Sequence, residues 1–525
     1  MKTSHVIVLI ILAVGLPLEM WAQSPHPNVL VSTQNSPSET AIAINPKNTR
    51  QLVAGANLNN QYTSLDGGQT WTWRTLTSPF SVWGDPVVVA DTTSAFYYFH
   101  LSNPSTRPSY AFPFIDRLLV QRTASATTPM SYRSFFALNP PKQQDKEWVA
   151  VDRRTNALYV TWTEFDTYGS LGSQDSTRIL FSKSVDQAQT WSPPQRISFY
   201  GGNAVDEDDT VEGAVPAVGP NGEVYVAWAG PRGIVFNRSL DAGQTWLPRE
   251  RTIVNQPGGW DYAVPGINRA NGLPVTACDA GSSPYRGSIY VNWTDQRNGP
   301  TDTDVWLVRS DDGGQTWSAP LRVNDDAPGR HQFFTWMTVD QATGYVWCVF
   351  YDRRNYTSID TRTDVYAARS TDGGRTFQNF RLSQSPFVPN QQVFIGDYTN
   401  ITAHNNVVRP VWTRMDNRQT SVWTALIDVN VLATPRATTV PGLELTTYPN
   451  PARTVLNLAV QAPTATNATF RLRTTDGRLV RTQTQAVAPT QLVLSLPVQD
   501  LPAGAYLLEA EIGSYTLHRK VLVVH

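Results

Sequence analysis

Acidic and aromatic residues stand just ahead of several short apolar runs in this chain of 525 residues. Neighbouring carboxyl groups can act as general acid and base in glycoside cleavage, and exposed Trp or Tyr rings can stack on sugar faces. The candidate catalytic residues are Asp85, Asp145, Glu147, Glu212, Asp397 and Tyr398, and the candidate substrate-binding residues are Trp148, Trp260, Asp261, Tyr262, Trp336, Arg353 and Arg354. The alternative for each acidic residue is that it accepts backbone N–H groups in a turn at the start of a strand.

Two segments that contain arginine repeat one pattern. Trp293-Thr-Asp295-Gln-Arg297 is followed by Asp304, and Phe350-Tyr-Asp352-Arg-Arg354 is followed by Asp364. Repetition of this kind indicates an ion pair that braces a loop. A binding role for Arg353 or Arg354 is the alternative.

Metal and cofactor motifs are weak or missing in the sequence. The run Asp206-Glu-Asp-Asp209 has clustered oxygens but lacks the ligand spacing and glycine of an EF-hand, so it predicts a solvated acidic loop and leaves calcium open. The seven His show no zinc-binding spacing, and no Walker loop, dinucleotide fingerprint or Gly-x-Ser-x-Gly occurs. We therefore predict no cofactor and no metal.

An eight-residue motif, Ser-x-Asp-x-Gly-x-Thr-Trp, recurs along the chain and indicates the elements that must position these residues. Its copies begin at Ser64, Ser184, Ser239, Ser310 and Ser370, and their central aspartates are Asp66, Asp186, Asp241, Asp312 and Asp372. In such a motif Asp and Ser accept backbone N–H groups in a tight turn, and Gly supplies a positive φ. The closing Trp, or Phe377 in the last copy, is expected between neighbouring sheets.

These copies resemble the Asp-box or BNR-repeat proteins, whose best-known members are the sialidases. The resemblance implies a β-propeller with the boxes on its outer rim, between the third and fourth strands of each blade, where they take no part in chemistry. Sialidases use three arginines to hold the substrate carboxylate, a Tyr paired with a Glu as nucleophile, and an Asp as acid/base. They also carry an Arg-Ile-Pro phrase before the first box. This chain contains no Arg-Ile-Pro, and only Arg50 precedes the first box.

The spacing of the boxes predicts the number of blades. The first interval, from Asp66 to Asp186, is about twice the others, so a decayed copy is expected within residues 117–128. Strand pairs are predicted to begin near Ala41, Val87, Val149, Ala214, Ala263, Thr335 and Asn400, and the run Asn28 to Ser32 could close the ring. The count favours seven blades, with the sialidase number of six as the alternative.

Propeller ligand sites normally lie at the mouth of the central channel, formed by residues just before the innermost strands. Most of the candidate residues occupy such positions, and Glu39 and His331 do as well. Tyr398 and Glu212 could form a nucleophile pair, but the sequence does not show that they meet.

The N-terminal sequence and the composition indicate where the protein acts and which partners it does not bind. Lys2, an apolar run from Val6 to Leu18 and Ala22 predict a cleaved secretory signal peptide over residues 1–22, too short for a membrane span. A net charge of −1, from 42 basic and 43 acidic residues, gives no electrostatic case for nucleic acid or an anionic membrane. The two cysteines, Cys278 and Cys348, are expected to be buried free thiols, with pairing across adjacent units as the alternative.

A second domain follows the propeller (residues 23–430) and a Thr/Pro-rich linker (431–447). Short alternating strands over residues 448–525 predict a small β-sandwich. Tyr448-Pro-Asn-Pro-Ala452, Asp476-Gly-Arg-Leu-Val480, Leu501-Pro-Ala-Gly-Ala-Tyr506 and Arg519-Lys-Val-Leu-Val-Val524 together resemble the type IX secretion sorting domain. The resemblance implies recognition by that machinery, passage across an outer membrane and release or anchoring at the cell surface.

The sequence therefore predicts an all-β, exported protein whose first hypothesis is binding of extracellular glycans or glycoproteins as a monomer. The second hypothesis is a glycoside hydrolase, sialidase-like in the broad sense, that uses the acidic residues at the mouth. The third is a structural surface protein. Whether the chain is an enzyme stays open on sequence grounds.

Overall fold

The computed structural model describes residues 26–103, 115–429, 443–474, 479–490, 492–513 and 515–525. The predicted signal peptide and residues 475–478 of the sorting-domain motif lie outside the described residues. The chain divides into two units, residues 1–428 and 429–525, and each is described by itself. Within the described ranges every regular element is a β-strand, which confirms the predicted all-β class.

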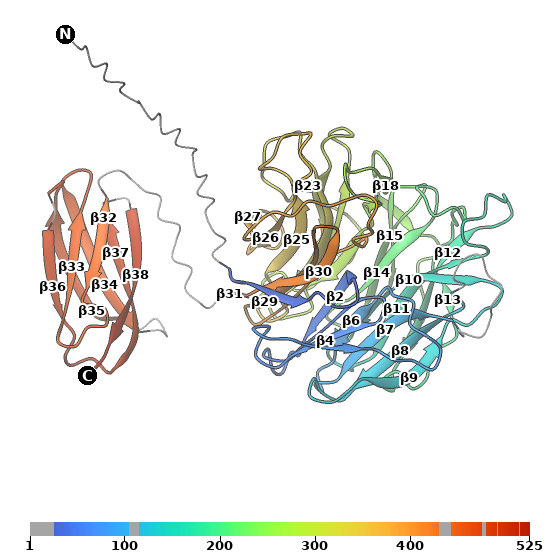
Figure 1. The fold of residues 1–525 in the computed structure, drawn as a ribbon, viewed down its shortest axis with the longest axis horizontal. Coiled ribbons are helices and arrows are strands. Elements are labelled where there is room, and N and C mark those ends of the chain that lie inside the picture. The colour runs from blue at the N-terminus through green and yellow to red at the C-terminus, as the bar shows by residue number, and fades with distance from the viewer. Residues whose placement is uncertain (1–25, 104–114, 430–442, 475–478, 491, 514) are drawn as a thin grey trace, which may run out of the picture. The chain divides into compact units, whose positions relative to one another are not determined.

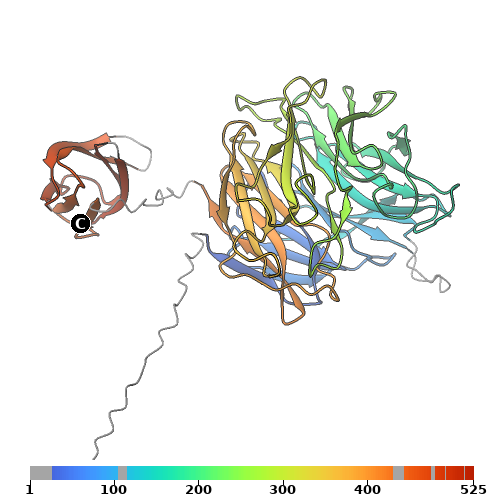
Figure 2. The same ribbon diagram turned by 90° about the horizontal axis from the view of Figure 1, so that it is seen from above.

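Unit 1 is built from antiparallel sheets of consecutive strands, as Figures 1 and 2 show. The first sheet contains β2 (Ser38–Ile44), β3 (Leu52–Asn57), β4 (Asn60–Ser64) and β5 (Thr72–Thr75). The second contains β6 (Val87–Ala90), β7 (Phe96–Ser102), β8 (Arg117–Thr123) and β9 (Ser131–Phe136). The third contains β10 (Gln143–Val151), β11 (Leu158–Phe165), β12 (Thr177–Ser184) and β13 (Gln195–Arg196).

The pattern continues through the rest of the unit. The fourth sheet contains β14 (Glu212–Val218), β15 (Val224–Ala229), β16 (Ile234–Ser239) and β17 (Arg251–Val254). The fifth contains β20 (Val275–Cys278), β21 (Ile289–Asp295), β22 (Asp304–Ser310) and β23 (Leu321–Arg322). The sixth contains β24 (Gln332–Val339), β25 (Val346–Asp352), β26 (Asp364–Ser370) and β27 (Gln378–Arg381). The last contains β28 (Asn400–His404), β29 (Val407–Asp416), β30 (Gln419–Ala425) and β1 (Asn28–Ser32), with β31 (Ile427–Asp428) beside β29.

The seven sheets of the described part of unit 1 form a closed ring. The first strand of each sheet contacts that of the next, from β2 through β6, β10, β14, β20, β24 and β28 and back to β2. The N-terminal strand β1 pairs antiparallel with β30, with Asn28 opposite Ala425. The ring therefore closes with the first strand of the chain, as the sequence predicted, and this pairing covers an open sheet edge.

Aromatic and aliphatic side chains fill the spaces between the sheets. One Trp from the second strand of five sheets is fully buried, namely Trp162, Trp228, Trp293, Trp347 and Trp412. Alternating side chains of a strand face opposite sides of its sheet, and in a ring both sides are covered by neighbours. This explains why strands β11 and β15 are buried along their whole length.

All five Asp boxes lie between the third and fourth strands of a sheet, as the resemblance implied. In the box of the fourth sheet, Asp241 Oδ1 accepts the N–H of Thr245 at 2.8 Å, and Asp241 Oδ2 accepts the Thr245 hydroxyl at 2.6 Å. Ser239 Oγ accepts the N–H of Gly243 at 2.8 Å. The box is thus a locally satisfied turn.

The boxes also join neighbouring sheets. The fourth residue of the motif offers its carbonyl to a basic side chain of the preceding sheet in four of the five boxes. The pairs are Arg409 Nε to Gly67 at 2.6 Å, Arg133 Nε to Gln187 at 3.0 Å, Lys183 Nζ to Ala242 at 2.8 Å, and Arg238 to Gly313. The box Trp packs the same way, since Trp246 lies against Phe181 with ring centroids 4.9 Å apart.

The second sheet carries the decayed box that the spacing predicted. Strand β8 ends at Thr123, whose hydroxyl donates to the carbonyl of Ser125 at 2.8 Å in place of the usual Ser–Asp arrangement. Strands β8 and β9 still pair, with Phe136 opposite Leu118. A Thr hydroxyl and the backbone bond from the Thr128 N–H to the Ser125 carbonyl, at 3.1 Å, take the place of the box aspartate in this turn.

The fifth strand pair begins later than predicted. The sequence placed it near Ala263, whereas the innermost strand β20 begins at Val275. The residues between form an inserted hairpin of β18 (Asp261–Tyr262) and β19 (Ala270–Asn271). Two short strands at hairpin spacing imitate the start of a blade, which is why the pattern misled the assignment.

Unit 2 contains two antiparallel sheets. One has the order β32 (Glu444–Tyr448), β33 (Val455–Gln461), β36 (Leu492–Pro497). The other has the order β35 (Leu479–Val487), β34 (Thr466–Thr474), β37 (Gly504–Ile512), β38 (Tyr515–Val523). Their inward residues form one apolar core that includes Leu458, Phe470 and Leu508. Strand β32 starts at Glu444, inside the stretch assigned to the linker.

Two smaller questions from the sequence are answered by the fold. Cys278 and Cys348 are both buried and both free, which agrees with the favoured expectation. Burial raises the pKa of the Cys348 thiol well above its ordinary value, so this group is an unreactive part of the core. A search of the described residues finds no helix with the length and apolar character needed to cross a membrane.

Candidate functional site

A repeated irregularity of the innermost strands positions the residues at the channel mouth. The register shifts between Ser38 and Ala41 in β2, between Asp145 and Trp148 in β10, and between Glu212 and Val215 in β14. Within the shifts Glu39 has a φ of 49° and Lys146 a φ of 50°. A β-bulge redirects a side chain at a strand end, and a left-handed conformation at a non-glycine residue is strained, so these positions are specified by more than sheet geometry.

Glycine is required where the last sheet meets the first at the mouth. Gly396 has a φ of 96°, and a Cβ atom there would lie 2.5 Å from the backbone nitrogen of Glu39. No other residue fits this approach. Its neighbour Asp397 is thereby held at the mouth, where it is 2% exposed.

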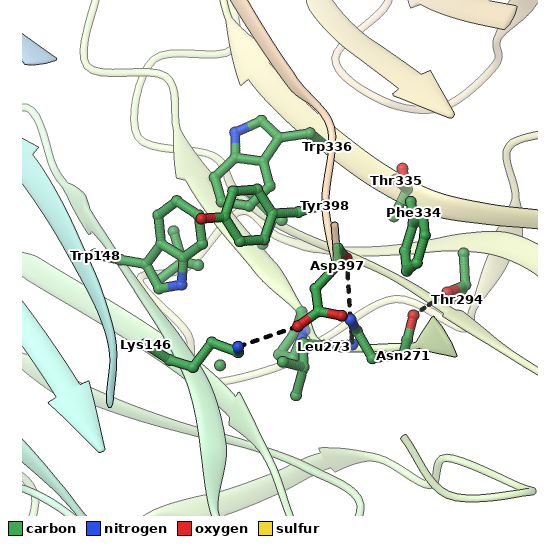
Figure 3. A pocket seen from close by; sticks show the side chains of 14 residues that line it. Lys146, Trp148, Asn271, Leu273, Thr294, Phe334, Thr335, Trp336, Asp397 and Tyr398 are labelled. Atoms are coloured by element: carbon green, nitrogen blue, oxygen red, sulfur yellow. Dashed lines mark hydrogen bonds and ion pairs between the residues drawn. The ribbon is translucent and has the colours of Figure 1, made fainter. Parts of the chain in front are cut away.

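Lys146 is the centre of a buried ion-pair network. Its Nζ lies 3.2 Å from Asp397 Oδ2, as Figure 3 shows, and 3.6 Å from Asp85 Oδ2. Burial opposes the charge of Lys146, but Asp85, Asp397 and Asp145 outweigh it and hold its pKa well above the ordinary value. Three sheets contribute to this network, so it depends on closure of the ring.

Arg269, from the inserted hairpin, is the second cation of the site. It donates from Nε to Asp397 Oδ1 at 2.9 Å and from Nη2 to Asp397 Oδ2. Its Nη1 lies 3.6 Å from Asp206 Oδ2, which also accepts the Tyr168 hydroxyl at 2.5 Å. Burial opposes the lowering of the Asp397 pKa, but Lys146 and Arg269 together keep that pKa below its ordinary value.

Two glutamates of the site have no hydrogen-bond partner among the described residues. Both carboxyl oxygens of Glu147 and both of Glu212 are buried without one. Burial, and then the charge of Asp85, raises the pKa of Glu147 well above its ordinary value. For Glu212 the causes are burial and then the charge of Asp206. These carboxyl groups are therefore held in the neutral, protonated form.

Other acidic groups share this tendency. Burial is the largest cause that raises the pKa of Asp145 to about 7, with Lys146 opposing it. The pKa of Glu39 is raised well above its ordinary value by burial and by the charges of Asp85 and Asp397. Asn57 links two sheets here, since it donates to Glu39 Oε2 and accepts the N–H of Asp85 at 2.8 Å.

Three aromatic rings lie beside the charged network and line a second, smaller space. The rings of Trp148 and Trp336 lie 4.3 Å apart, and that of Tyr398 lies 5.1 Å from Trp148, as Figure 3 shows. They border a narrow hollow of about 20 Å³, which is room for about one water. The hydroxyl of Tyr398 is buried without a hydrogen-bond partner among the described residues.

A larger cavity of about 490 Å³ lies at the mouth. Its polar lining consists mainly of Lys146, Asp206, Glu212, Asp261, Arg269 and Asp397, and Trp260 and Tyr262 contribute aromatic surface. Lys146, Asn271, Leu273 and Asp397 border both this cavity and the narrow hollow. The size and the convergence of polar groups are typical of a small-molecule site.

The structure therefore brings most of the predicted residues together but separates some. Tyr398 and Glu212 border different parts of the channel, the hollow and the cavity. Trp260 is 5% exposed and donates from Nε1 to the carbonyl of Thr210 at 3.2 Å, so its indole N–H already has a partner within the fold. Tyr262 is similarly bonded, with its hydroxyl 2.9 Å from the carbonyl of Asn271.

The arginines of the repeated pattern lie outside the residues that border the cavity. Arg354 Nη2 is 2.8 Å from Asp352 Oδ2, and Arg297 Nη2 is 2.5 Å from Asp295 Oδ2, which are the loop-bracing pairs that the repetition predicted. Arg353 is 3% exposed and donates from Nε to the Thr363 hydroxyl at 3.1 Å. Burial lowers its pKa to about 10.

Sequence reasoning missed Lys146, Asp206 and Arg269. Lys146 lies between the candidates Asp145 and Glu147, and Arg269 belongs to an insertion. The interval of 71 residues between Asp241 and Asp312, the longest between intact neighbouring boxes, was the available signal for that insertion. The expectation of a solvated acidic loop is wrong for Asp206, because this carboxyl binds Tyr168 and faces Arg269.

A metal site finds no support among the described residues. No group of three or more His, Cys, Asp or Glu side chains there has the arrangement that could hold a metal ion. In the acidic run, Asp208 Oδ1 instead accepts the N–H of Asp261 at 2.7 Å. Calcium binding stays an open prediction.

Two parts of the chain match known protein families. Residues 446–524 match the secretion system C-terminal sorting domain, and residues 308–319 match the BNR/Asp-box repeat. The sequence resemblances to a sorting domain and to Asp-box proteins are thereby confirmed. The sorting domain supports secretion or a location at the cell surface.

Several solved structures are similar to this chain at low sequence identity. A Hadza microbial sialidase is 13% identical, with 72% of this chain and 73% of that chain covered and a TM-score of 0.40. YCF48 bound to D1 peptide is 12% identical, with 78% and 98% covered and a TM-score of 0.40. An α-L-arabinanase of Penicillium chrysogenum is 8% identical, with 76% and 97% covered and a TM-score of 0.40. No curated protein matches the chain.

Proposed function

We propose that this exported propeller binds a glycan in the cavity at its channel mouth. The observation that carries the proposal is a cavity of about 490 Å³ whose wall includes Glu212, a fully buried carboxyl group with both oxygens free of hydrogen bonds. A buried polar group without a partner is costly, and a ligand that supplies one recovers that cost. Sugar hydroxyls both donate and accept, which suits carboxyl groups in either protonation state.

The lining of the cavity adds support for a sugar-sized ligand. Asp261 is exposed at the rim, whereas Glu212 and Asp397 lie deep, so polar groups are available at two depths. Trp260 and Tyr262 give apolar surface between them. Such a mixture of few polar groups and aromatic walls is characteristic of sites that orient a small ligand.

A bulky residue at the rim tests this proposal. Ala263 is exposed and lines the cavity, so Ala263→Trp should obstruct it without disturbing the core. Ala342, an exposed alanine in the β24–β25 turn, gives the matched control Ala342→Trp. We expect the full mature chain to retain a subset of glycans on an array, Ala263→Trp to weaken that binding at least tenfold, and Ala342→Trp to leave it unchanged. No glycan bound by the folded wild-type chain, or equal binding by Ala263→Trp, would contradict the proposal.

A second candidate function is glycoside hydrolysis. Two carboxyl groups of one cavity have opposite tendencies, since burial holds Glu212 protonated while Lys146 and Arg269 hold Asp397 ionised. Environments that drive two pKa values apart are characteristic of an acid and its partner in catalysis. Glu212 would then protonate the leaving oxygen of the glycosidic bond.

Mass spectrometry separates hydrolysis from binding. The mature chain is incubated with a pool of sialylated and neutral glycans, and the products are identified. Loss of a sugar unit that Glu212→Gln abolishes, with binding retained, supports hydrolysis. An unchanged pool with a folded protein removes this candidate and leaves the binding proposal standing.

We further infer that the type IX secretion machinery recognises residues 448–525. The family match over residues 446–524 supports this inference. Deletion of residues 443–525 should leave the propeller inside the cell envelope, and fractionation of producing cells would show where it stays.

A further inference from the structure

The charge balance of the mouth cavity distinguishes between classes of sugar. Its two cations are already bound, since Arg269 makes two hydrogen bonds to Asp397 and Lys146 is 3.2 Å from the same carboxylate. Each cation also has a second carboxylate nearby. Arg269 Nη1 lies 3.6 Å from Asp206 Oδ2, and Lys146 Nζ lies 3.6 Å from Asp85 Oδ2. Both basic groups of the described cavity lining, Lys146 and Arg269, therefore already face carboxylates.

Acidic groups are in excess in the same place. Seven carboxyl side chains surround the two cations, namely those of Glu39, Asp85, Asp145, Glu147, Asp206, Glu212 and Asp397. Among them Glu212 borders the cavity, is 0% exposed and has two oxygens without a hydrogen-bond partner. A cationic donor that entered the cavity would meet an unused acceptor, whereas an anion would have to compete with Asp397 for Lys146 and Arg269.

We propose that the ligand is an amino sugar whose free ammonium group binds between Glu212 and Asp206. This inference rests on the proposed glycan binding and not on hydrolysis. Burial and the nearby charge of Asp206 keep a proton on Glu212 while the cavity is empty. An ammonium group has three N–H donors and would replace that single proton with hydrogen bonds to both.

The exchange makes binding release a proton. The charged and titratable groups around Glu212 are Asp206 from the preceding loop, Asp145 and Lys146 from β10, and Tyr168 from the β11–β12 loop. Arg269, Asp261 and Asp397 share its cavity. Burial raises the pKa of Glu212, so at neutral pH the proton is present before binding and leaves afterwards. Affinity should rise with pH, by up to tenfold per unit for one proton, until the ligand amine loses its own charge.

Calorimetry with three trisaccharide probes tests the proposal on the full mature chain. The probes are a glucosamine trimer with free amines, its N-acetylated counterpart and a sialylated lactose. We expect the free amine to bind at least tenfold more tightly than the N-acetylated sugar and the sialylated sugar not to bind. Titrations in buffers of different ionisation enthalpy should show about one proton released.

Isosteric variants assign the effect to the cavity. Glu212→Gln should remove the preference for the free amine and the proton release, with an unchanged or higher melting temperature. Glu223, a partly buried glutamate in the β14–β15 turn that accepts from Asn221, provides the control Glu223→Gln, which should bind like the wild type. Should Glu212→Gln fail to fold, Asp261→Asn at the exposed rim should still weaken amine binding about threefold.

The outcomes separate failure of the inference from failure of the proposed function. Equal or tighter binding of the N-acetylated or sialylated sugar overturns the amino-sugar inference and leaves glycan binding intact. A lysine tripeptide that binds more tightly than the glucosamine trimer also overturns it, since the ammonium then belongs to a peptide. No binding of any sugar by the folded protein overturns both.

Discussion

The acidic residues at the rim of the propeller and those at its mouth have opposite environments. At the rim, hydrogen bonds from Thr245 and Ser239 outweigh a small burial effect and lower the pKa of Asp241 to about 2. At the mouth, Glu147 and Glu212 are buried without a hydrogen-bond partner among the described residues, and their pKa values are raised. Asp241 has its donors within four residues of the chain, whereas Glu147 and Glu212 have none among the described residues.

The difference shows which acids serve the fold. A depressed folded pKa, as for Asp241, gives stability that is present above the unfolded value of about 3.9 and is lost as pH falls towards 2. A raised folded pKa, as for Glu147, gives stability that is present below about 4.3 and is lost as pH rises. Asp241 therefore stabilises the protein at neutral pH, whereas Glu147 and Glu212 destabilise it, which is the pattern expected of groups kept for a ligand.

Lys146→Met should produce the largest effect, because it removes the counter-ion of two buried carboxylates. Asp397 and Asp85 are 2% and 8% exposed, and loss of one partner of a buried ion pair costs about 3–5 kcal/mol in the free energy of unfolding. Urea unfolding at pH 7 followed by Trp fluorescence measures this, and it reports unit 1 alone because residues 429–525 contain no Trp.

The control for this prediction is Lys47→Met. Lys47 is exposed, and substitutions of this kind usually change stability by less than about 0.5 kcal/mol. If both variants were equally stable, the ion-pair network would not be the element that holds the mouth together.

Glu147→Gln should have the next largest effect and the opposite sign. Gln is neutral at every pH, so it avoids the penalty of ionising or holding a proton on a buried group without a partner. We expect the variant to be more stable than the wild type at pH 8, by a margin that grows with pH, and nearly equal at pH 4.

Unfolding curves at several pH values would show the trend as a slope. The wild type should lose stability relative to Glu147→Gln by up to about 1.4 kcal/mol per pH unit above pH 4.3. A variant that is less stable at pH 8 would indicate that the Glu147 carboxylate is paired in solution, and the comparison between rim and mouth would fail for this residue.

The same contrast explains what the sequence could and could not predict. An Asp box is a local device, with donor and acceptor within four residues, so its turn, its place between two strands and the propeller class follow from the repeat itself. Glu212 and Asp397 could be nominated because they precede innermost strands, although their roles stay predictions. Their protonation could not be predicted, because it depends on groups from other sheets. The role of Arg269 in the site could not be predicted, because this residue belongs to an insertion whose position is decided by tertiary packing.

Loss of one Asp box should have the smallest effect. Asp241→Ala removes four hydrogen bonds, from Ser239, Gln244 and Thr245, to a partly exposed carboxylate, a loss similar to that of a helix cap, at about 1 kcal/mol. Asp241→Asn keeps one acceptor oxygen, so its stability should lie between those of the wild type and Asp241→Ala. The difference from the wild type should fade as pH falls from 4 to 2, where the wild-type carboxylate takes up its proton.

The second sheet explains why this effect should be small. Its turn has no Asp, yet β8 and β9 remain paired through the Thr123 hydroxyl. The Lys183 bond to the Ala242 carbonyl and the packing of Trp246 on Phe181 also persist in Asp241→Ala, because neither uses the carboxylate. A loss above about 3 kcal/mol, measured by urea unfolding at pH 7, would mean that the box aspartate is essential to the blade, and the rim would then resemble the mouth in depending on single buried charges.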